Sequence, residues 1–122
     1  MNHEIGKKER YSLLTVKEEK ILSTNAPDLK AACLKLEGEG VRNIILDLEV
    51  TKYVDSSGLS AILLFHKTCK KNNGVLVLTG LQDAVKNLLR ISQLDSILVV
   101  VGTFDEARDY IMMEELEKDI RG

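Results

Sequence analysis

The stretch Val50-Thr-Lys-Tyr-Val-Asp-Ser-Ser-Gly-Leu59 separates two segments of different hydrophobic periodicity. Before it, Ile44-Ile-Leu-Asp-Leu48 is a short apolar run of the kind that forms a buried strand. Aspartate, serine and glycine within the stretch are typical of a tight turn at a helix N-terminus. After it, residues at helical spacing share one face: Leu59, Ile62, Leu63, His66 and Cys69. The sequence therefore predicts a strand, a turn and an amphipathic helix in succession.

The same alternation continues on both sides of this unit. Strands are expected at residues 11–16, 21–22, 43–48, 75–78 and 97–101. Helices are expected at residues 27–38, 57–71, 81–89 and from 103 onward. A strand, a helix and a parallel strand in succession form a crossover that is right-handed by default. The pattern predicts an α/β single domain with a mixed, largely parallel sheet packed by about four helices.

The last helix has a distinct start signal. Thr103 with Glu106 three residues later forms a capping box, in which each side chain satisfies an amide at the helix start. Phe104, Ala107 and Ile111 would form the inward face of this helix. The segment 114–122 is expected to fray.

Length and composition indicate one domain. A chain of 122 residues can bury roughly two-thirds of its unfolded surface around a single core. Apolar residues make up 44% of the chain and charged residues 30%, which is typical of a soluble globular protein. Residues 1–10 are polar and lack a signal-peptide core, so we expect a mobile lead-in there and the domain at 11–118. No apolar run approaches bilayer length, and a cytoplasmic protein is expected.

Charge argues against nucleic acid as a partner. The formal net charge is −2, with acids and bases interspersed, so no basic face stands out that would neutralise backbone phosphates. Lys67, Lys70 and Lys71 cluster near the end of the second predicted helix. Cations there complement the helix dipole and need no ligand to explain them.

The residue types that carry catalysis or bind metals are sparse. Cys33 and Cys69 lie far apart on apolar helical stripes and match no zinc-ligand spacing, so reduced core thiols are expected. His3 lies in the lead-in, and His66 on an apolar helical face is more typical of a core or boundary histidine than of a catalytic base or a ligand. We expect no cofactor, no metal and no enzymatic activity.

Ser56 is a candidate switch. A serine in the first turn of a helix lies beside unpaired amides and the positive end of the dipole, so a phosphate there would be tolerated locally. The phosphate would also add about −1.5 to −2 charges to the surface. The same residue types are favoured helix caps, so a purely structural role is the alternative.

The segment Asp55-Ser-Ser-Gly-Leu59 and its flanks resemble the STAS domain of bacterial anti-sigma factor antagonists. The likeness runs from about Tyr11 through the last helix and includes Asn43 to Leu48 and Gly74 to Leu94. In that family the serine directly after the aspartate is phosphorylated, and Ser56 holds this position.

The resemblance implies a function in binding. It implies a protein that, when unphosphorylated, binds an anti-sigma factor and frees a sigma factor for transcription. The partner would also be a serine kinase, a separate phosphatase would restore the active form, and ATP and metal would belong to those enzymes. The contact would be shaped by the neighbours of Ser56, namely Asp55, Ser57, Gly58 and Leu59.

Two positions depart from the family pattern. Related antagonists often carry Gly-Glu-Leu-Asp in the opening loop, whereas this chain has Glu19-Lys-Ile-Leu22. Leu22 therefore replaces an aspartate of the partner-facing surface, which leaves open the type of kinase and whether one acts at all. Ser60 stands where the family often has glycine.

The sequence also permits other assignments. A response-regulator receiver would use Asp47, Thr79 and the pair Glu18-Glu19, but 97–102 has no lysine followed by proline. Asp47 is then a polar residue near a strand end. Within the STAS fold, the chain could instead be a subunit of a lipid-transport ATPase or a scaffold of a stress-sensing complex, with Ser56 only a helix cap. A nucleophilic serine would need a neighbouring base, which the sequence does not single out.

Overall fold

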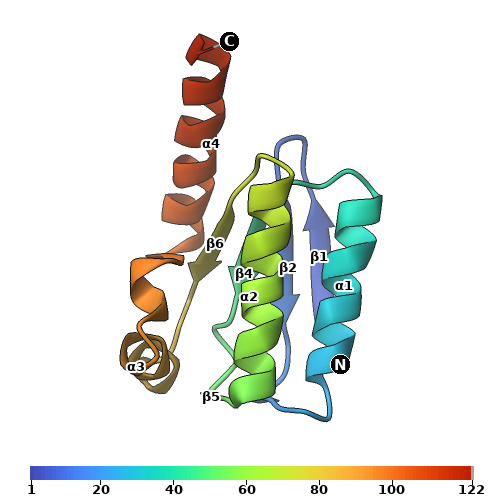
Figure 1. The fold of residues 1–122 in the computed structure, drawn as a ribbon, viewed down its shortest axis with the longest axis vertical. Helices are drawn as coiled ribbons and strands as arrows, with labels where there is room; N and C mark the ends of the chain where they lie inside the picture. Colours follow the sequence, from blue (N-terminus) through green and yellow to red (C-terminus); the bar gives the residue numbers. More distant parts are fainter. Residues whose placement is uncertain (122) are drawn as a thin grey trace.

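The computed structural model describes residues 1–121 and contains seven strands and four α-helices (Figure 1). The strands are β1 (His3–Lys7), β2 (Ser12–Val16), β3 (Lys20–Ile21), β4 (Ile44–Asp47), β5 (Tyr53–Val54), β6 (Leu76–Thr79) and β7 (Val99–Val101). The helices are α1 (Ala26–Gly38), α2 (Ser56–Lys71), α3 (Asp83–Ile91) and α4 (Phe104–Arg121), with a short 3-10 helix, η1 (Leu94–Ser96).

Five strands form the main sheet in the order β1-β2-β4-β6-β7. β1 is antiparallel to β2, and each of the other neighbours is parallel. The predicted mixed, largely parallel sheet is therefore confirmed. A separate parallel pair, β3 and β5, brings the loop after β2 beside the segment that leads into α2.

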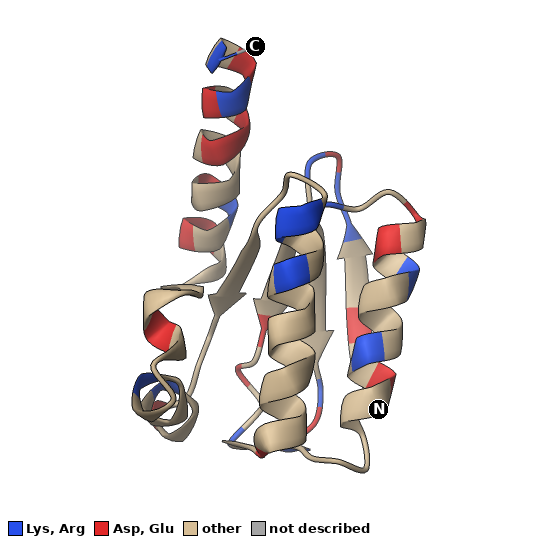
Figure 2. Cartoon of the chain, in the orientation of Figure 1, with Lys and Arg blue, Asp and Glu red and all other residues tan. Residues whose placement is uncertain are grey.

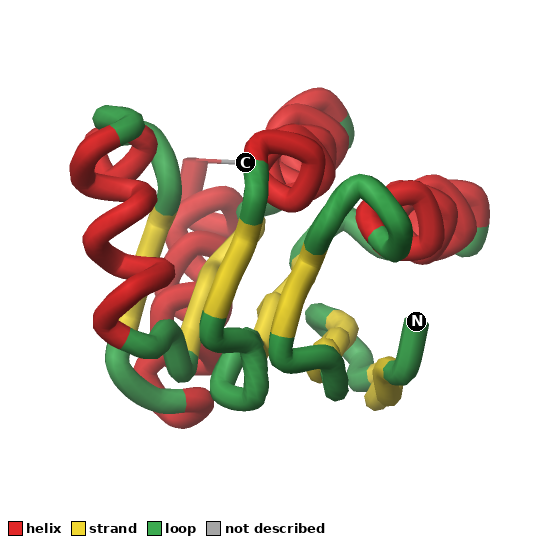
Figure 3. Tube along the Cα trace, turned by 90° about the horizontal axis from the view of Figure 1, so that it is seen from below, coloured by secondary structure: helices red, strands yellow, loops and turns green. Residues whose placement is uncertain are grey.

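The helices cover the two faces of the sheet unequally (Figure 3). The larger apolar cluster joins α1, α2 and α3 to one face, through side chains such as Leu29, Phe65 and Val85. The smaller cluster lies on the opposite face, where Ala107 and Ile111 of α4 pack on the sheet. Strands buried on both faces need apolar residues at successive positions, which explains the continuous run in β4.

The start of α4 follows the sequence prediction in part: the Thr103 side chain accepts a helix amide, whereas within residues 1–121 the Glu106 side chain bonds the Thr103 hydroxyl and not the Thr103 amide. The amide of Glu106 donates to the Thr103 hydroxyl at 3.2 Å, and that hydroxyl donates to Glu106 Oε1 at 3.1 Å. Ala107 and Ile111 are buried and Phe104 is partly buried against the sheet. The predicted inward face of the helix is confirmed.

Two expectations about the chain ends are wrong. Residues 3–7 of the expected mobile lead-in form β1, because their backbone pairs with β2. Residues 114–121 of the segment that was expected to fray continue α4 as an ordered helix, and Gly122 of that segment lies outside the described residues. The anchor of the helix is Glu115, which is buried and accepts two hydrogen bonds from Arg42 Nη2, each 2.8 Å long.

The lysines that end α2 behave as the sequence predicts. Lys70 and Lys71 lie in the last turn of the helix (Figure 2), where they complement its dipole. Lys71 also pairs with Glu37 of α1 at 2.8 Å. None of the helices within residues 1–121 combines the length and apolar character needed to cross a membrane.

Candidate functional site

The turn before α2 is fixed by the side chain of Asp55. Asp55 is the N-cap residue in extended conformation, and its Oδ1 accepts the amide of Gly58 at 2.9 Å. Its other oxygen, Oδ2, accepts the amide of Ser23 at 3.1 Å. One carboxylate thus caps the helix and holds a loop that lies 32 residues earlier in the chain. The alternative in which Ser56 serves as the helix cap is wrong, because Asp55 fills that role.

The loop that Asp55 holds has its own internal bonds. The amide of Leu22 donates to Asn25 Oδ1 at 2.7 Å, and Asn25 Nδ2 donates to the carbonyl of Lys20 at 2.8 Å. These bonds give residues 20–25 a defined shape beside the start of α2. Leu22, the residue that departs from the family pattern, immediately precedes Ser23, whose amide donates to Asp55 of the motif.

Gly58 is required by close packing. A Cβ atom at this position would lie 2.5 Å from Val54 Cγ1 and 2.8 Å from the carbonyl oxygen of Ile21. Both neighbours belong to the small β3–β5 sheet, so α2 approaches that sheet more closely than any side chain would permit. Gly58 is buried, so it shapes the surface around Ser56 only through the position of the helix.

Ser56 is the first residue of α2 and is exposed. It lines a groove of about 490 Å³ together with Leu59 and Ser60. Leu63 and Leu64 of α2 and Leu94 of η1 form the apolar part of the groove, whereas Lys30 and Lys67 bring positive charge to it. Ser57 is half-buried beside Ser56. The structure thus brings Ser56, Leu59 and Ser60 to one surface and uses Asp55 and Gly58 to shape it.

Sequence reasoning missed several residues of this surface. Lys30 lies in α1 and Leu94 in η1, and neither is within a motif, so their position beside Ser56 depends on how the helices pack. Tyr53 is also exposed, over 54% of its surface, immediately before the motif. Tyr53 does not line the groove, and its exposure follows from its alternation with the buried Val54.

His66 lies too far from Ser56 to act as its base. His66 lines a different pocket, with Lys70 and Tyr110, and lies ten residues further along α2, or about 15 Å. Burial lowers the pKa of His66, helped by the charges of Lys70 and Lys67. Within residues 1–121, side chains of His, Cys, Asp and Glu form no cluster of three or more that could hold a metal ion.

Asp47 and Thr79 resemble two positions of a response-regulator receiver. They are neighbours in the register of the sheet. Asp47 ends β4 and its Oδ1 accepts the amide of Glu49 at 2.9 Å, which is an ordinary turn contact at a strand end. Thr79 is buried. The prediction that Asp47 is a polar residue near a strand end is confirmed.

Both cysteines are buried free thiols, as predicted. Burial raises the pKa of Cys69 to about 12, with a further contribution from Cys33. Burial also raises the pKa of Cys33. A neutral, buried thiol is a poor nucleophile, so neither cysteine suits catalysis.

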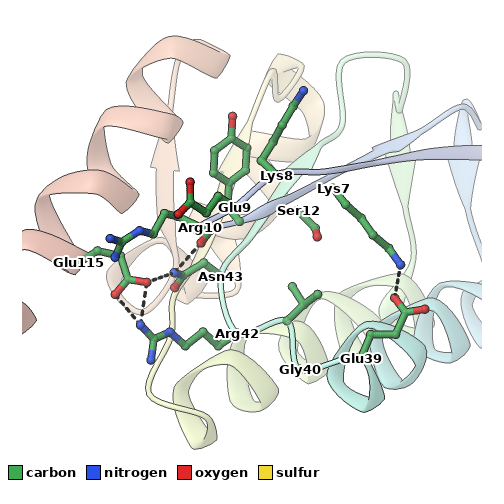
Figure 4. A pocket seen from close by; sticks show the side chains of 12 residues that line it. Lys7, Lys8, Glu9, Arg10, Ser12, Glu39, Gly40, Arg42, Asn43 and Glu115 are labelled. Atoms are coloured by element: carbon green, nitrogen blue, oxygen red, sulfur yellow. Dashed lines mark hydrogen bonds and ion pairs between the residues drawn. The ribbon is translucent and has the colours of Figure 1, made fainter.

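A second pocket, of about 520 Å³, lies at the other end of the sheet (Figure 4). The β1–β2 hairpin supplies Lys7, Lys8 and Arg10, and α4 supplies Glu115. Asn43 Nδ2 donates to Glu115 Oε1 and to the carbonyl of Arg10, both at 2.9 Å. This network joins α4 to the hairpin and to the start of β4.

The comparisons with known proteins agree on one family. The model of the STAS domain matches residues 4–108. BtrV of Bordetella bronchiseptica, a protein assigned as an anti-sigma factor antagonist, is 34% identical over 85 residues, which cover 70% of this chain and 73% of BtrV.

Solved structures show the same fold. An anti-sigma factor antagonist from Mycobacterium paratuberculosis superposes with a TM-score of 0.81 at 18% identity, covering 91% of this chain and 93% of that one. The Bacillus cell fate determinant SpoIIAA in its phosphorylated form gives a TM-score of 0.70 at 18% identity, covering 90% of this chain and 99% of that one.

Proposed function

Because the chain belongs to the STAS domain family and its relatives are anti-sigma factor antagonists, we propose that it binds an anti-sigma factor when Ser56 is unphosphorylated. Binding would release a sigma factor for transcription. The output of the protein would be an interaction, not a reaction, and it would act in the cytoplasm with no cofactor of its own. Phosphorylation of Ser56 would switch the interaction off.

The observation that carries the proposal is the division of roles between Asp55 and Ser56. Asp55 supplies the helix cap, so the Ser56 hydroxyl is not needed for that purpose. Ser56 is exposed and lines a groove with an apolar floor. A serine that is free of the capping role and accessible to another protein is suited to modification.

Charge explains how one phosphate would act. Lys30 and Lys67 in the groove favour an acidic group on the partner. A phosphate on Ser56 would place about −1.5 to −2 charges in the same groove, where it would repel that group and compete for the lysines. A loss of about 3 kcal/mol would weaken binding more than 100-fold.

The partner would carry the chemistry. A serine kinase, which we propose is the anti-sigma factor itself, would use ATP and metal to transfer phosphate to Ser56, and a serine phosphatase would remove it. SpoIIAA, a structural relative, has been solved in a phosphorylated form. Leu22 places an apolar side chain in the loop that Asp55 holds, so the kinase would meet a less polar surface there than in relatives with aspartate.

Capture of partners from a lysate of the source cells tests the proposal. Wild-type protein and Ser56→Asp would be immobilised in parallel, and the bound proteins identified by mass spectrometry. Asn87→Asp is the matched control, because it adds the same charge at an exposed position of α3 that does not line the groove.

We expect an anti-sigma factor to be held by the wild type and by Asn87→Asp and to be lost with Ser56→Asp. Capture of the same partners by all three proteins would contradict the switch. Capture of a transport ATPase or of a large assembly of homologous proteins, unaffected by Ser56→Asp, would favour a constitutive structural role for the domain.

A further inference from the structure

A pocket of about 430 Å³ lies where strands β4 and β6 end and helix α4 begins. Asp47 and Glu49 line it from the end of β4, Thr79 and Leu81 from the end of β6, and Phe104 from the start of α4. None of these residues lines the groove beside Ser56. The volume is within the range of sites that bind small molecules, about 300–1,000 Å³.

One buried polar atom in this pocket has no partner. Thr79 is only 2% exposed, and its Oγ1 is the only buried side-chain nitrogen or oxygen within residues 1–121 that makes no hydrogen bond. A buried hydroxyl without a partner destabilises the folded state, so such a group needs an explanation wherever it occurs. A ligand that bonds this hydroxyl would supply what the free protein lacks.

The sheet register directs this hydroxyl and the carboxylate of Asp47 to the same place. Thr79 is the register partner of Asp47, and the residues two positions earlier, Val77 and Ile45, pack in the cluster beneath α4. Side chains alternate along a strand, so Asp47 and Thr79 also project to the α4 side, at the end of the sheet. Gly80, with φ +72°, leaves space for the carboxylate, because a Cβ there would lie 2.8 Å from Asp47 Oδ1.

The charge of the pocket is negative and has no counterion within the described chain. Asp47 and Glu49 line it, no lysine, arginine or histidine does, and neither acid takes part in an ion pair within residues 1–121. Arg108, which lies over the ring of Phe104, pairs with two other acids of α4 instead. The pocket therefore favours a cation.

The shape of the pocket favours an organic cation over a metal ion. No cluster of three or more His, Cys, Asp or Glu side chains in residues 1–121 could hold a metal ion. Leu81 and Phe104 provide apolar walls, which suit a carbon chain. An ammonium group has three hydrogen-bond donors and no acceptor, which matches two carboxylates and a hydroxyl. A guanidinium prefers both oxygens of one carboxylate, but Asp47 Oδ1 already accepts the amide of Glu49.

We propose that this pocket binds the primary ammonium group of an aliphatic amine. The carboxylate of Asp47 and the hydroxyl of Thr79 accept hydrogen bonds from the ammonium, and the exposed Glu49 supplies the second negative charge. The carbon chain lies against Leu81 and Phe104. A free amine and the lysine side chain of a peptide both carry this group.

The proposed site is separate from the proposed switch. The two pockets share no lining residue, and the amine site lies on the side of the sheet that α4 covers. Binding of an amine does not require Ser56, its phosphorylation or an anti-sigma factor. Each proposal can therefore fail without the other.

Heteronuclear NMR titration of the full chain tests the site, with the diamine putrescine as the probe at constant ionic strength. We expect saturable shifts at the amides of residues 47–49, 79–81 and 102–104, with a dissociation constant of about 0.1–1 mM. Butanediol of the same length is the neutral control and should not bind. Nα-acetyl-lysine methylamide is the peptide arm, and the tighter of the two amines identifies the source of the ammonium group.

Variants of the two central residues test how the ammonium is held. Asp47→Asn keeps Oδ1 for the amide of Glu49 but removes the charge, so it should weaken binding at least about tenfold. Asp119→Asn is the control, because it removes the same charge from an exposed residue outside the pocket.

Thr79→Val should also weaken binding about tenfold, whereas Thr79→Ser, which keeps the hydroxyl, should bind within about threefold of the wild type. Without ligand, Thr79→Val should raise the midpoint of urea unfolding, because it removes a buried hydroxyl that has no partner.

Four results would overturn the proposal. The first is the absence of saturable binding of either amine at these residues. The second is binding of butanediol, or of MgCl₂ at lower concentration than the amines. The third is equal binding by Asp47→Asn and Asp119→Asn, or by Thr79→Val and Thr79→Ser. The fourth is a lower urea midpoint for Thr79→Val, which would show that the hydroxyl already has a partner.

Discussion

The carboxylate of Asp55 accepts the amide of Gly58 at 2.9 Å, and the two residues together set the position of α2. Asp55 satisfies an amide that the first helical turn leaves unpaired. Gly58 allows that turn to lie against Ile21 and Val54. Ser56, between them, takes no part in either function, which is why its surface is available to a partner.

Replacement of Gly58 by alanine should destabilise the fold by about 1–3 kcal/mol, because the new methyl group would overlap Val54 and the backbone of Ile21. Urea unfolding measures this change through the transition midpoint. Gly38→Ala is the control, since no atom lies within 4 Å of a Cβ at that position in α1. Equal midpoints for both variants would show that the close packing at Gly58 is not required.

Removal of the Asp55 carboxylate should lower the free energy of unfolding more than removal of the Ser56 hydroxyl. We expect Asp55→Ala to lower the free energy of unfolding by about 1–2 kcal/mol, because an amide in the first turn and the amide of Ser23 both lose their acceptor. Ser56→Ala should change it by less than about 0.5 kcal/mol. The same urea titration separates the two. A Ser56→Ala variant as unstable as Asp55→Ala would mean that Ser56 is structural after all.

The anchor of α4 should respond to acid. Although burial acts to raise the pKa of Glu115, the hydrogen bonds and charge of Arg42 and Asn43 outweigh it and hold the pKa below its ordinary value. A carboxyl group with a lowered pKa in the folded state adds stability above its unfolded pKa, about 4.3, and loses it as the pH falls further. As the pH is lowered from about 7 to about 3, the unfolding midpoint should therefore fall more steeply for the wild type than for Glu115→Gln. Parallel curves for the two proteins would contradict this role.

The cysteines should react only when the protein unfolds. Burial raises the pKa of both thiols, that of Cys69 to about 12, so almost no thiolate exists at neutral or mildly alkaline pH. Labelling with a thiol reagent at about pH 8 should be slow in the native state and fast for both cysteines in denaturant. Rapid labelling of either native thiol would show that the packing of α1 against α2 opens readily.

The main sheet and its helices could be predicted because each element has its own periodic pattern. The apolar run of β4 and the helical stripe of α2 each identify an element without knowledge of the others. The motif Asp55–Leu59 is equally local, and the role that it assigns to Ser56 stays a prediction. These features are local, and local patterns are what a single sequence displays.

The features that were missed depend on contacts between distant residues. β5 has only two residues and exists because β3 pairs with it. In the sequence alone, Glu115 resembles the other charged residues of a solvated tail. Its partner Arg42, which neutralises its charge, lies 73 residues earlier in the chain. The second hydrogen bond of Asp55, to Ser23, is also non-local. Such partners are decided by packing, which periodicity does not reveal.

The most direct test of the central proposal is the affinity of the captured anti-sigma factor for this protein with and without phosphate on Ser56. Binding would be measured for the unmodified protein, for the protein phosphorylated by its kinase, and for Ser56→Ala after the same treatment. We predict that phosphorylation weakens binding about 100-fold or more and that Ser56→Ala neither takes up phosphate nor loses affinity. Equal affinities for the phosphorylated and unmodified proteins, or phosphate uptake by Ser56→Ala equal to that of the wild type, would contradict the proposal.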